Sequence, residues 1–272
     1  MTLRFLTALL MMGCSISGAL ASNIAVHYKE GLTHGFLVLN SLDGTPIAEG
    51  DLAEVVRGSQ VTSHLVHHFK DGSLQDETTV FSQRATFSLI RYHLIQKGPA
   101  FKHPTEISVE MASGQVTVRY TDDKGNEKEE SEHMKLPPDL ANGMVLTLLK
   151  NVRPDGPLPK LSFVVATPKP RIVKLSVSSP GTDPYSLVGA GRRAIHYVLK
   201  VELGGVTGVL AELLGKEPPD AHIWITSGEA PTFVKSESLA YFGGPVWRTE
   251  LTCPVWPKAA EPEKKGMSEG KP

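Results

Sequence analysis

Turn-forming residues recur at short intervals along the first half of this 272-residue chain, and they constrain its fold more than any other feature. Between the turns, apolar and polar residues alternate; Ile107, Val109 and Met111, for example, are separated by polar residues. This is the period of a half-buried strand. Strands joined by such short turns leave no room for helical crossovers, so the pattern predicts an antiparallel meander. The turn formers are Asp43-Gly44, 57–59, Asp71–Ser73, Ser113-Gly114 and 122–126.

The second half contains further strand-like segments, and the composition agrees with them. Aromatic residues make up 7 % of the chain, whereas its 25 Gly and 20 Pro favour frequent turns and few helices. We therefore expect a mainly β fold. The later strands are expected at 158–166, 171–178, 196–203, 221–227, 232–237 and 246–252.

One segment, about 139–151, has the pattern of a helix. Asp139 follows Pro137-Pro138 as an N-cap, and Leu140, Met144 and Leu148 form an apolar stripe at helical spacing. The opposite side carries three polar residues, Asn142, Thr147 and Asn151. The sequence therefore predicts one amphipathic helix packed on the sheet. Gly143 within it suggests a close backbone approach to a neighbour.

The N-terminus has the pattern of an export signal. Arg4 precedes an apolar run from Phe5 to Met12, and Ala19-Leu20-Ala21 offers a cleavage site before Ser22. We expect residues 1–21 to be removed and the product to be periplasmic or secreted, without a transmembrane anchor, because the apolar run is shorter than the ~20 residues that span a bilayer. A lipoprotein attached through Cys14 is the alternative, since Met11–Cys14 loosely resembles a lipobox.

After that cleavage, residues 22–256 form one expected β-rich domain and 257–272 a disordered tail without apolar periodicity. Cys253 is then the one remaining cysteine, so an intramolecular disulfide is excluded. An apolar core must stabilise the fold instead.

Charge and motifs argue against several function classes. The 28 Lys and Arg nearly balance 29 Asp and Glu, so nucleic acid is not an expected partner. Residues 189–194 match the G-x-G-x-x-G/A motif of dinucleotide-binding proteins. That motif must be followed by a helix, but the next segment has the pattern of a strand. The sequence contains no G-x-S-x-G, Walker or C-x-x-C motif. We therefore expect a non-enzymatic protein without a cofactor.

Histidines are the weak candidates for a metal site. His64 and His68 share one face of an expected strand, and His93 lies on another strand. A metal would need these rings to converge with further ligands, and no H-E-x-x-H motif or Cys/His pair supports this. We expect no metal, and we expect these histidines to lie on the surface or to line a pocket.

Four blocks of the sequence carry a resemblance. They are Phe69–Ser73 with Asp76-Glu77, Ile95–Pro99, Leu136–Gly143 and Gly243–Trp247. They resemble those of an uncharacterised family of exported bacterial proteins without an established activity. More loosely, the order of strands, one apolar helix and further strands is similar to the half-barrel of the LolA/LolB lipoprotein carriers. That similarity implies a curved sheet or half-barrel wrapped round the helix at 139–151, with an apolar cavity for acyl chains.

Three functional hypotheses follow. The first is a cell-envelope protein that binds or carries an apolar ligand, a lipid or acyl chain, in a cavity lined by Leu140, Met144 and Leu148. The alternative is a structural or interaction module that docks an envelope protein through its sheet edges or through Trp247 and Trp256. An enzyme at His64, His68 and His93 is a third, weaker reading.

Overall fold

The structure is a computed structural model that describes residues 24–153, 155–166, 169–187, 190–202, 218–241 and 243–253. The expected signal peptide, Cys14, Trp256 and the expected tail lie outside these residues. The described chain is mainly β, with fourteen strands and one six-residue helix.

The first eight strands form the expected meander. Each pairs antiparallel with the next, and glycines at positive φ occupy the turns, including Gly44 (φ 91°), Gly72 (φ 84°) and Gly125 (φ 80°). The strands are β1 (Thr33–Ser41), β2 (Pro46–Arg57), β3 (Gln60–Phe69), β4 (Leu74–Gln83), β5 (Phe87–Lys97), β6 (Thr105–Glu110), β7 (Gln115–Thr121) and β8 (Glu127–His133).

The later strands form a second meander that joins the first. β14 pairs antiparallel with β1, with Leu37 opposite Leu251, so one open fourteen-stranded sheet results, with β8 at one end and β9 at the other. These strands are β9 (Lys160–Ala166), β10 (Pro170–Leu187), β11 (Ala190–Val201), β12 (Ala221–Thr226), β13 (Phe233–Leu239) and β14 (Val246–Thr252).

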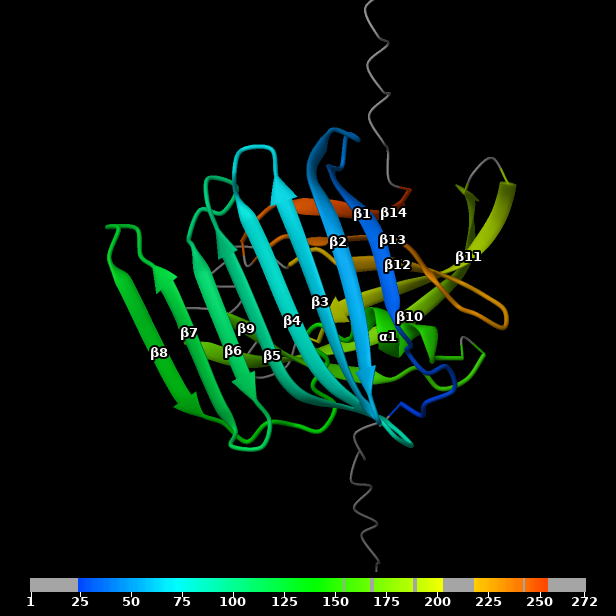
Figure 1. The fold of residues 1–272 in the computed structure, drawn as a ribbon, viewed down its shortest axis with the longest axis horizontal. Helices are drawn as coiled ribbons and strands as arrows, with labels where there is room; N and C mark the ends of the chain where they lie inside the picture. The colour runs from blue at the N-terminus through cyan, green and yellow to red at the C-terminus, as the bar shows by residue number, and fades with distance from the viewer. Residues whose placement is uncertain are drawn as a thin grey trace, which may run out of the picture.

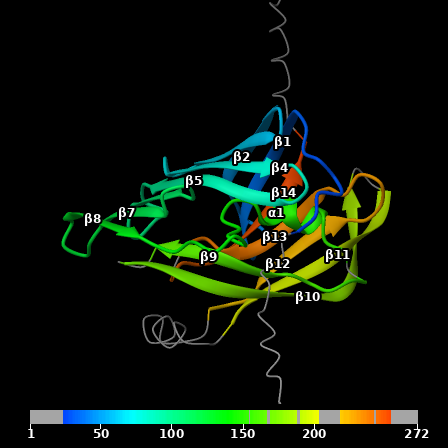
Figure 2. The same ribbon diagram turned by 90° about the horizontal axis from the view of Figure 1, so that it is seen from below.

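The sheet bends so that its two halves lie over one another. Figure 1 shows β9–β14 crossing behind β1–β8, and Figure 2 shows α1 (Val145–Lys150) between the two layers. A core of buried side chains from both layers and from the segment around α1 fills the space between them, with Phe81, Met144, Leu161 and Tyr197 among its most buried members. The chain between β8 and β9 is thus part of the core.

The expected amphipathic helix at 139–151 is wrong in both length and pattern. The helix spans only Val145–Lys150. Asn142, Thr147 and Asn151, expected on a polar face, are 4–5 % exposed, so this segment is buried on several sides. In the described part of the chain, no helix has the length and apolar character needed to cross a membrane.

Hydrogen bonds with β9 explain why the helix starts late. The backbone of Asp139 and Ala141 bonds to Ser162 at 3.0 and 2.9 Å, as a neighbouring strand would. The Asn142 side chain continues this pattern, since its amide donates to Val164 O and accepts from Val164 N, both at 2.8 Å. Gly143 then turns the chain at φ 67°. Residues 139–142 therefore satisfy part of the β9 edge instead of forming a helical turn.

Candidate functional site

The three residues expected to line an apolar cavity do meet in the interior. Leu140, Met144 and Leu148 are 2 %, 1 % and 5 % exposed. They surround a cavity of about 10 Å³. A space of about 10–15 Å³ accommodates one water molecule, far less than an acyl chain needs. The remaining lining residues are Ile24, Phe87, Pro138, Asp139 and Leu161.

Polar contacts fix the segment around α1 in this interior. Asp139 accepts a hydrogen bond from Ser162 Oγ at 2.7 Å and pairs with Lys174 Nζ at 3.1 Å. At the other end, Asn151 Oδ1 accepts from the backbone N–H groups of His27 and Tyr28 at 2.8 and 2.6 Å. Side-chain hydrogen bonds thus hold both ends of the segment. Removing the segment from the interior would break these bonds and is therefore costly.

A buried cluster of charged groups lies at the C-terminal end of α1. Lys150 Nζ is 2.5 Å from Glu30 Oε1, and both side chains are largely buried. The Glu54 side chain faces Glu30 and Ser63. Burial, reinforced by the neighbouring Glu30 carboxylate, raises the pKa of Glu54 to about 7, because both effects disfavour a second negative charge. The cluster can therefore take up or release a proton near neutral pH.

A second acid, Glu77, bonds to Tyr92, whose ring lies close to Gly143. Tyr92 Oη donates to Glu77 Oε2 at 3.1 Å, and burial raises the pKa of Glu77. A Cβ built on Gly143 would overlap Thr79 Oγ1 and lie 3.1 Å from Tyr92 Cε2, so this glycine makes the close approach that the sequence suggested.

Within the described residues, Thr79 Oγ1 and both ring nitrogens of His67 are buried without a hydrogen-bond partner. Burial lowers the pKa of His67 to about 4.

The candidate metal histidines do not form a site. His64 bonds to Asp76 at 2.9 Å and His93 to Glu106 at 2.8 Å, each as a separate partly exposed pair. Because β4 separates their strands, their backbones lie about 10 Å apart at the usual strand spacing. His68 is exposed. Among the described residues, no group of three or more His, Cys, Asp or Glu side chains could hold a metal ion.

A different pair of histidines, not predicted from the sequence, comes together on β11 and β12. His196 Nε2 lies 2.9 Å from His222 Nδ1, and the His196 ring stacks on Trp224 at 4.4 Å. Asp183 accepts from Trp224 Nε1 at 2.8 Å and lies 3.3 Å from His196 Nδ1. The register of β11 against β12, which places His196 opposite Trp224, brings these residues together. Burial lowers the pKa of His196, although Asp183 opposes that effect.

Trp247 is partly buried and packs against a small aromatic cluster. Its ring lies 5.2 Å from Phe69 and 5.9 Å from Phe101, in a small cluster between β3 and β14. Part of its surface is therefore covered by this cluster, and part remains exposed. Trp256, the other expected docking residue, lies outside the described residues. Cys253 is free and exposed.

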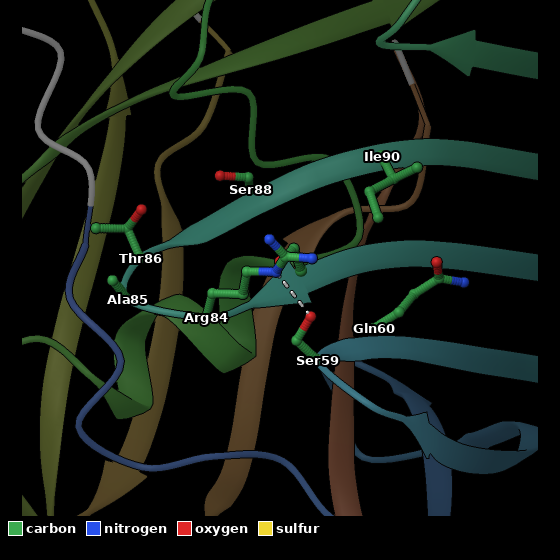
Figure 3. Close-up of a pocket in the computed structure, with 8 residues that line it drawn as sticks. Ser59, Gln60, Arg84, Ala85, Thr86, Ser88 and Ile90 are labelled. Carbon is green, nitrogen blue, oxygen red and sulfur yellow. Dashed lines mark hydrogen bonds between the residues drawn. The ribbon is translucent and has the colours of Figure 1, made fainter.

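A surface depression of about 450 Å³ opens on the outer face of the first layer. It lies where the β2–β3 and β4–β5 turns meet, and Arg84 extends across its middle (Figure 3). The Arg84 Nε donates to Ser59 Oγ at 3.1 Å. The other lining residues are Gln60, Ser82, Ala85, Thr86, Ser88 and Ile90.

Comparison with known proteins gives one structural similarity. No family model and no curated protein matches the sequence. A crystal structure described as a β-barrel-like protein of a domain of unknown function, DUF1849, from Brucella abortus matches with a TM-score of 0.44 at 8 % identity, covering 82 % of this chain and 97 % of that one. The description of that protein names no activity. The architectural similarity to the LolA/LolB carriers stays a prediction.

Proposed function

We propose that this chain is a non-enzymatic structural or protein-interaction module of the cell envelope. The observation that carries the proposal is the content of the interior. The space between the two layers, where a carrier would hold its ligand, is occupied by the chain's own segment around α1, with a cavity of about 10 Å³ beside it. A packed interior suits a protein that works through its surface.

The exposed end of the sheet supports an interaction role. β8 is a terminal strand, so one side of its backbone has no partner among the described strands, and most of its residues are exposed. A free edge of this kind can accept an extended segment of another protein. Its charged sequence, with Glu127, Glu129, Glu130 and Glu132, disfavours pairing with a second copy of itself.

A second candidate function, carriage of an apolar ligand, is favoured by two observations. Leu140, Met144 and Leu148 line the interior cavity together, and the sheet is open, because β8 and β9 are its two ends. Carriage would require the segment around α1 to leave the interior. The two candidates therefore differ in whether that segment must move.

A disulfide that locks the segment separates them. Leu140 and Ser162 form a parallel bridge, so their Cα atoms lie about 5 Å apart, within the range that disulfides span. The double variant Leu140→Cys, Ser162→Cys is made in a Cys253→Ser background. Its oxidised form, with the disulfide closed, is compared with its reduced form. We expect no stoichiometric lipid in extracts of the wild-type protein and equal binding of a fluorescent fatty acid by oxidised and reduced protein. One lipid per chain, with binding that appears only after reduction, would establish carriage instead.

Site-specific photocrosslinking tests the interaction role directly. A photoreactive residue at Lys128 in β8 reports on the exposed edge, and the same residue at Lys200 in β11, an exposed position inside the sheet, is the matched control. We expect one defined partner to crosslink at position 128 in cells and not at 200. Equal labelling at both positions, or none at either, would contradict a role for this edge.

A further inference from the structure

The surface depression around Arg84 has the composition of an anion site. Its lining offers one guanidinium, the hydroxyls of four Ser and Thr residues and one amide, and it contains no carboxylate. The segments that build it continue this bias, since residues 55–70 and 78–105 contain neither Asp nor Glu. Glu110 stands opposite Arg91 on the neighbouring strand and does not line the depression.

Alternation along the strands explains why these groups face outward together. Val61, Phe81 and Phe87 point into the core and are 0–3 % exposed. Their neighbours Gln60, Ser82 and Ser88, which lie opposite one another across β3, β4 and β5, therefore point to the outer face. The side chains are fixed to adjacent strands of one sheet, which gives the depression a stable floor.

The Arg84 side chain is held in place but keeps its strongest donors free. The bond from its Nε to Ser59 Oγ orients the guanidinium over the depression (Figure 3). In the part of the chain that the structure describes, its two terminal amino groups have no protein partner. A guanidinium with free terminal amino groups matches a pair of oxyanion oxygens in a bidentate arrangement.

The number of donors and the volume select the ligand class. The guanidinium and the hydroxyl and amide groups around it offer more hydrogen-bond donors than the two oxygens of one carboxylate can use. A phosphate monoester has three terminal oxygens that can accept from them. A volume of about 450 Å³ also exceeds what a free phosphate fills, and Ile90 and Ala85 offer apolar contact to an attached organic group. We propose that this depression binds the phosphate group of a phosphate monoester, with Arg84 as the principal ligand.

Two sources share this chemistry, a soluble sugar or polyol phosphate and a phosphomonoester lipid headgroup. Glycerol 3-phosphate, with glycerol as the uncharged control, probes the first by titration calorimetry and amide NMR shifts. Vesicles of phosphatidylcholine with and without phosphatidic acid probe the second.

We expect saturable binding of glycerol 3-phosphate, with amide shifts centred on Ser59, Ser82 and Ser88. Vesicle binding that glycerol 3-phosphate inhibits would identify the headgroup as the source, and its absence would identify the soluble ester; both results support the site.

Two arginine variants make the test specific. Arg84→Gln should weaken binding about tenfold or more, because a charge-assisted bidentate contact is lost. Arg57→Gln removes an exposed arginine at the same end of the sheet that does not line the depression, and it should change affinity less than about twofold. Equal weakening in both variants would mean diffuse charge attraction and would overturn the proposal, as would no saturable binding of either probe. Arg84 is exposed, so its substitution should leave the melting temperature unchanged.

Discussion

Gly143 is the residue at which backbone conformation and packing impose the same requirement. Its φ of 67° lies in the left-handed region, and a Cβ there would overlap Thr79 Oγ1, which is buried. The glycine therefore allows the segment around α1 to lie directly against β4 and β5. It also separates the strand-like residues 139–142 from the helix that follows.

Substitution of Gly143 should be far more damaging than the backbone conformation alone predicts. Gly143→Ala should cost more than about 3 kcal/mol of unfolding free energy, since overpacking of a core adds to the ~1–2 kcal/mol of a left-handed non-glycine residue. Gly125→Ala is the control, because Gly125 has a similar φ of 80° with nothing within 4 Å of a built Cβ. Urea midpoints measure both. Equal losses of unfolding free energy in the two variants would mean that the segment around α1 does not touch Thr79.

Burial on several sides of α1 changes the expectation for charged substitutions there. A solvent-facing Thr147 would tolerate aspartate, but Thr147 and Leu148 are both 5 % exposed. Thr147→Asp and Leu148→Asp should therefore each destabilise the protein by several kcal/mol, on the order of the whole ~5–15 kcal/mol of a typical domain. Leu32→Asp, at a position that is 87 % exposed, should be nearly silent in the same urea titration. A silent Thr147→Asp would contradict the burial of this helix.

At the scale of elements, the charged cluster of Glu30, Glu54 and Lys150 connects α1 to the N-terminal segment and β2. Lys150 comes from α1, Glu30 from the segment before β1, Glu54 from β2, and Ser63 approaches from β3. Glu54 binds its proton more tightly in the folded state than in the unfolded state, where its pKa is about 4.5. Folding is therefore favoured by this group below pH 4.5, and the contribution is lost as the pH rises through about 7.

The pH dependence of an isosteric variant should reveal this contribution. Glu54→Gln should match the wild type near pH 4.5 and exceed it at pH 8 by up to about 3 kcal/mol, since the amide never ionises. Glu49→Gln, at an exposed position of the same strand, should differ from the wild type by less than ~0.5 kcal/mol at both pH values. Chemical denaturation at each pH provides the comparison, and a constant Glu54→Gln difference would show that folding does not raise the pKa of Glu54.

His67 acts in the opposite direction over an overlapping range. Its lowered pKa of about 4 means that the neutral ring is favoured in the folded state, so stability is present above pH 6.5 and is lost as the pH falls towards 4. The wild-type profile therefore combines both groups, whereas the difference between the wild type and Glu54→Gln isolates the carboxyl.

At the scale of the whole molecule, one sheet and one core unite the two meanders. β14 pairs with β1, and the core includes side chains from both layers and from the segment around α1. The two halves share the buried surface that stabilises each of them. They should therefore unfold together.

Hydrogen exchange can measure this cooperativity. The amides of Tyr92 in β5 and Tyr197 in β11, both in the shared core, should exchange with the same opening free energy, equal to that of global unfolding. The amides of β8, which is terminal and largely exposed, should exchange with a lower opening free energy. Two clearly different values for β5 and β11 would mean that the layers unfold independently.

The sequence by itself determined the mainly β class, the antiparallel order of the first meander and the close approach at Gly143, because turn chemistry and strand alternation act over a few residues. Only the tertiary structure decided the conformation of 139–151, where partners on β9 compete with the helical pattern, and the pairing of β14 with β1. The His196–Trp224 stack and the Arg84 depression depend on register between strands, and the cluster of Glu30, Glu54 and Lys150 depends on packing between the layers. Local patterns fix which residues are apolar or turn-forming, whereas contacts between distant segments depend on which arrangement buries the most surface and satisfies the most polar groups.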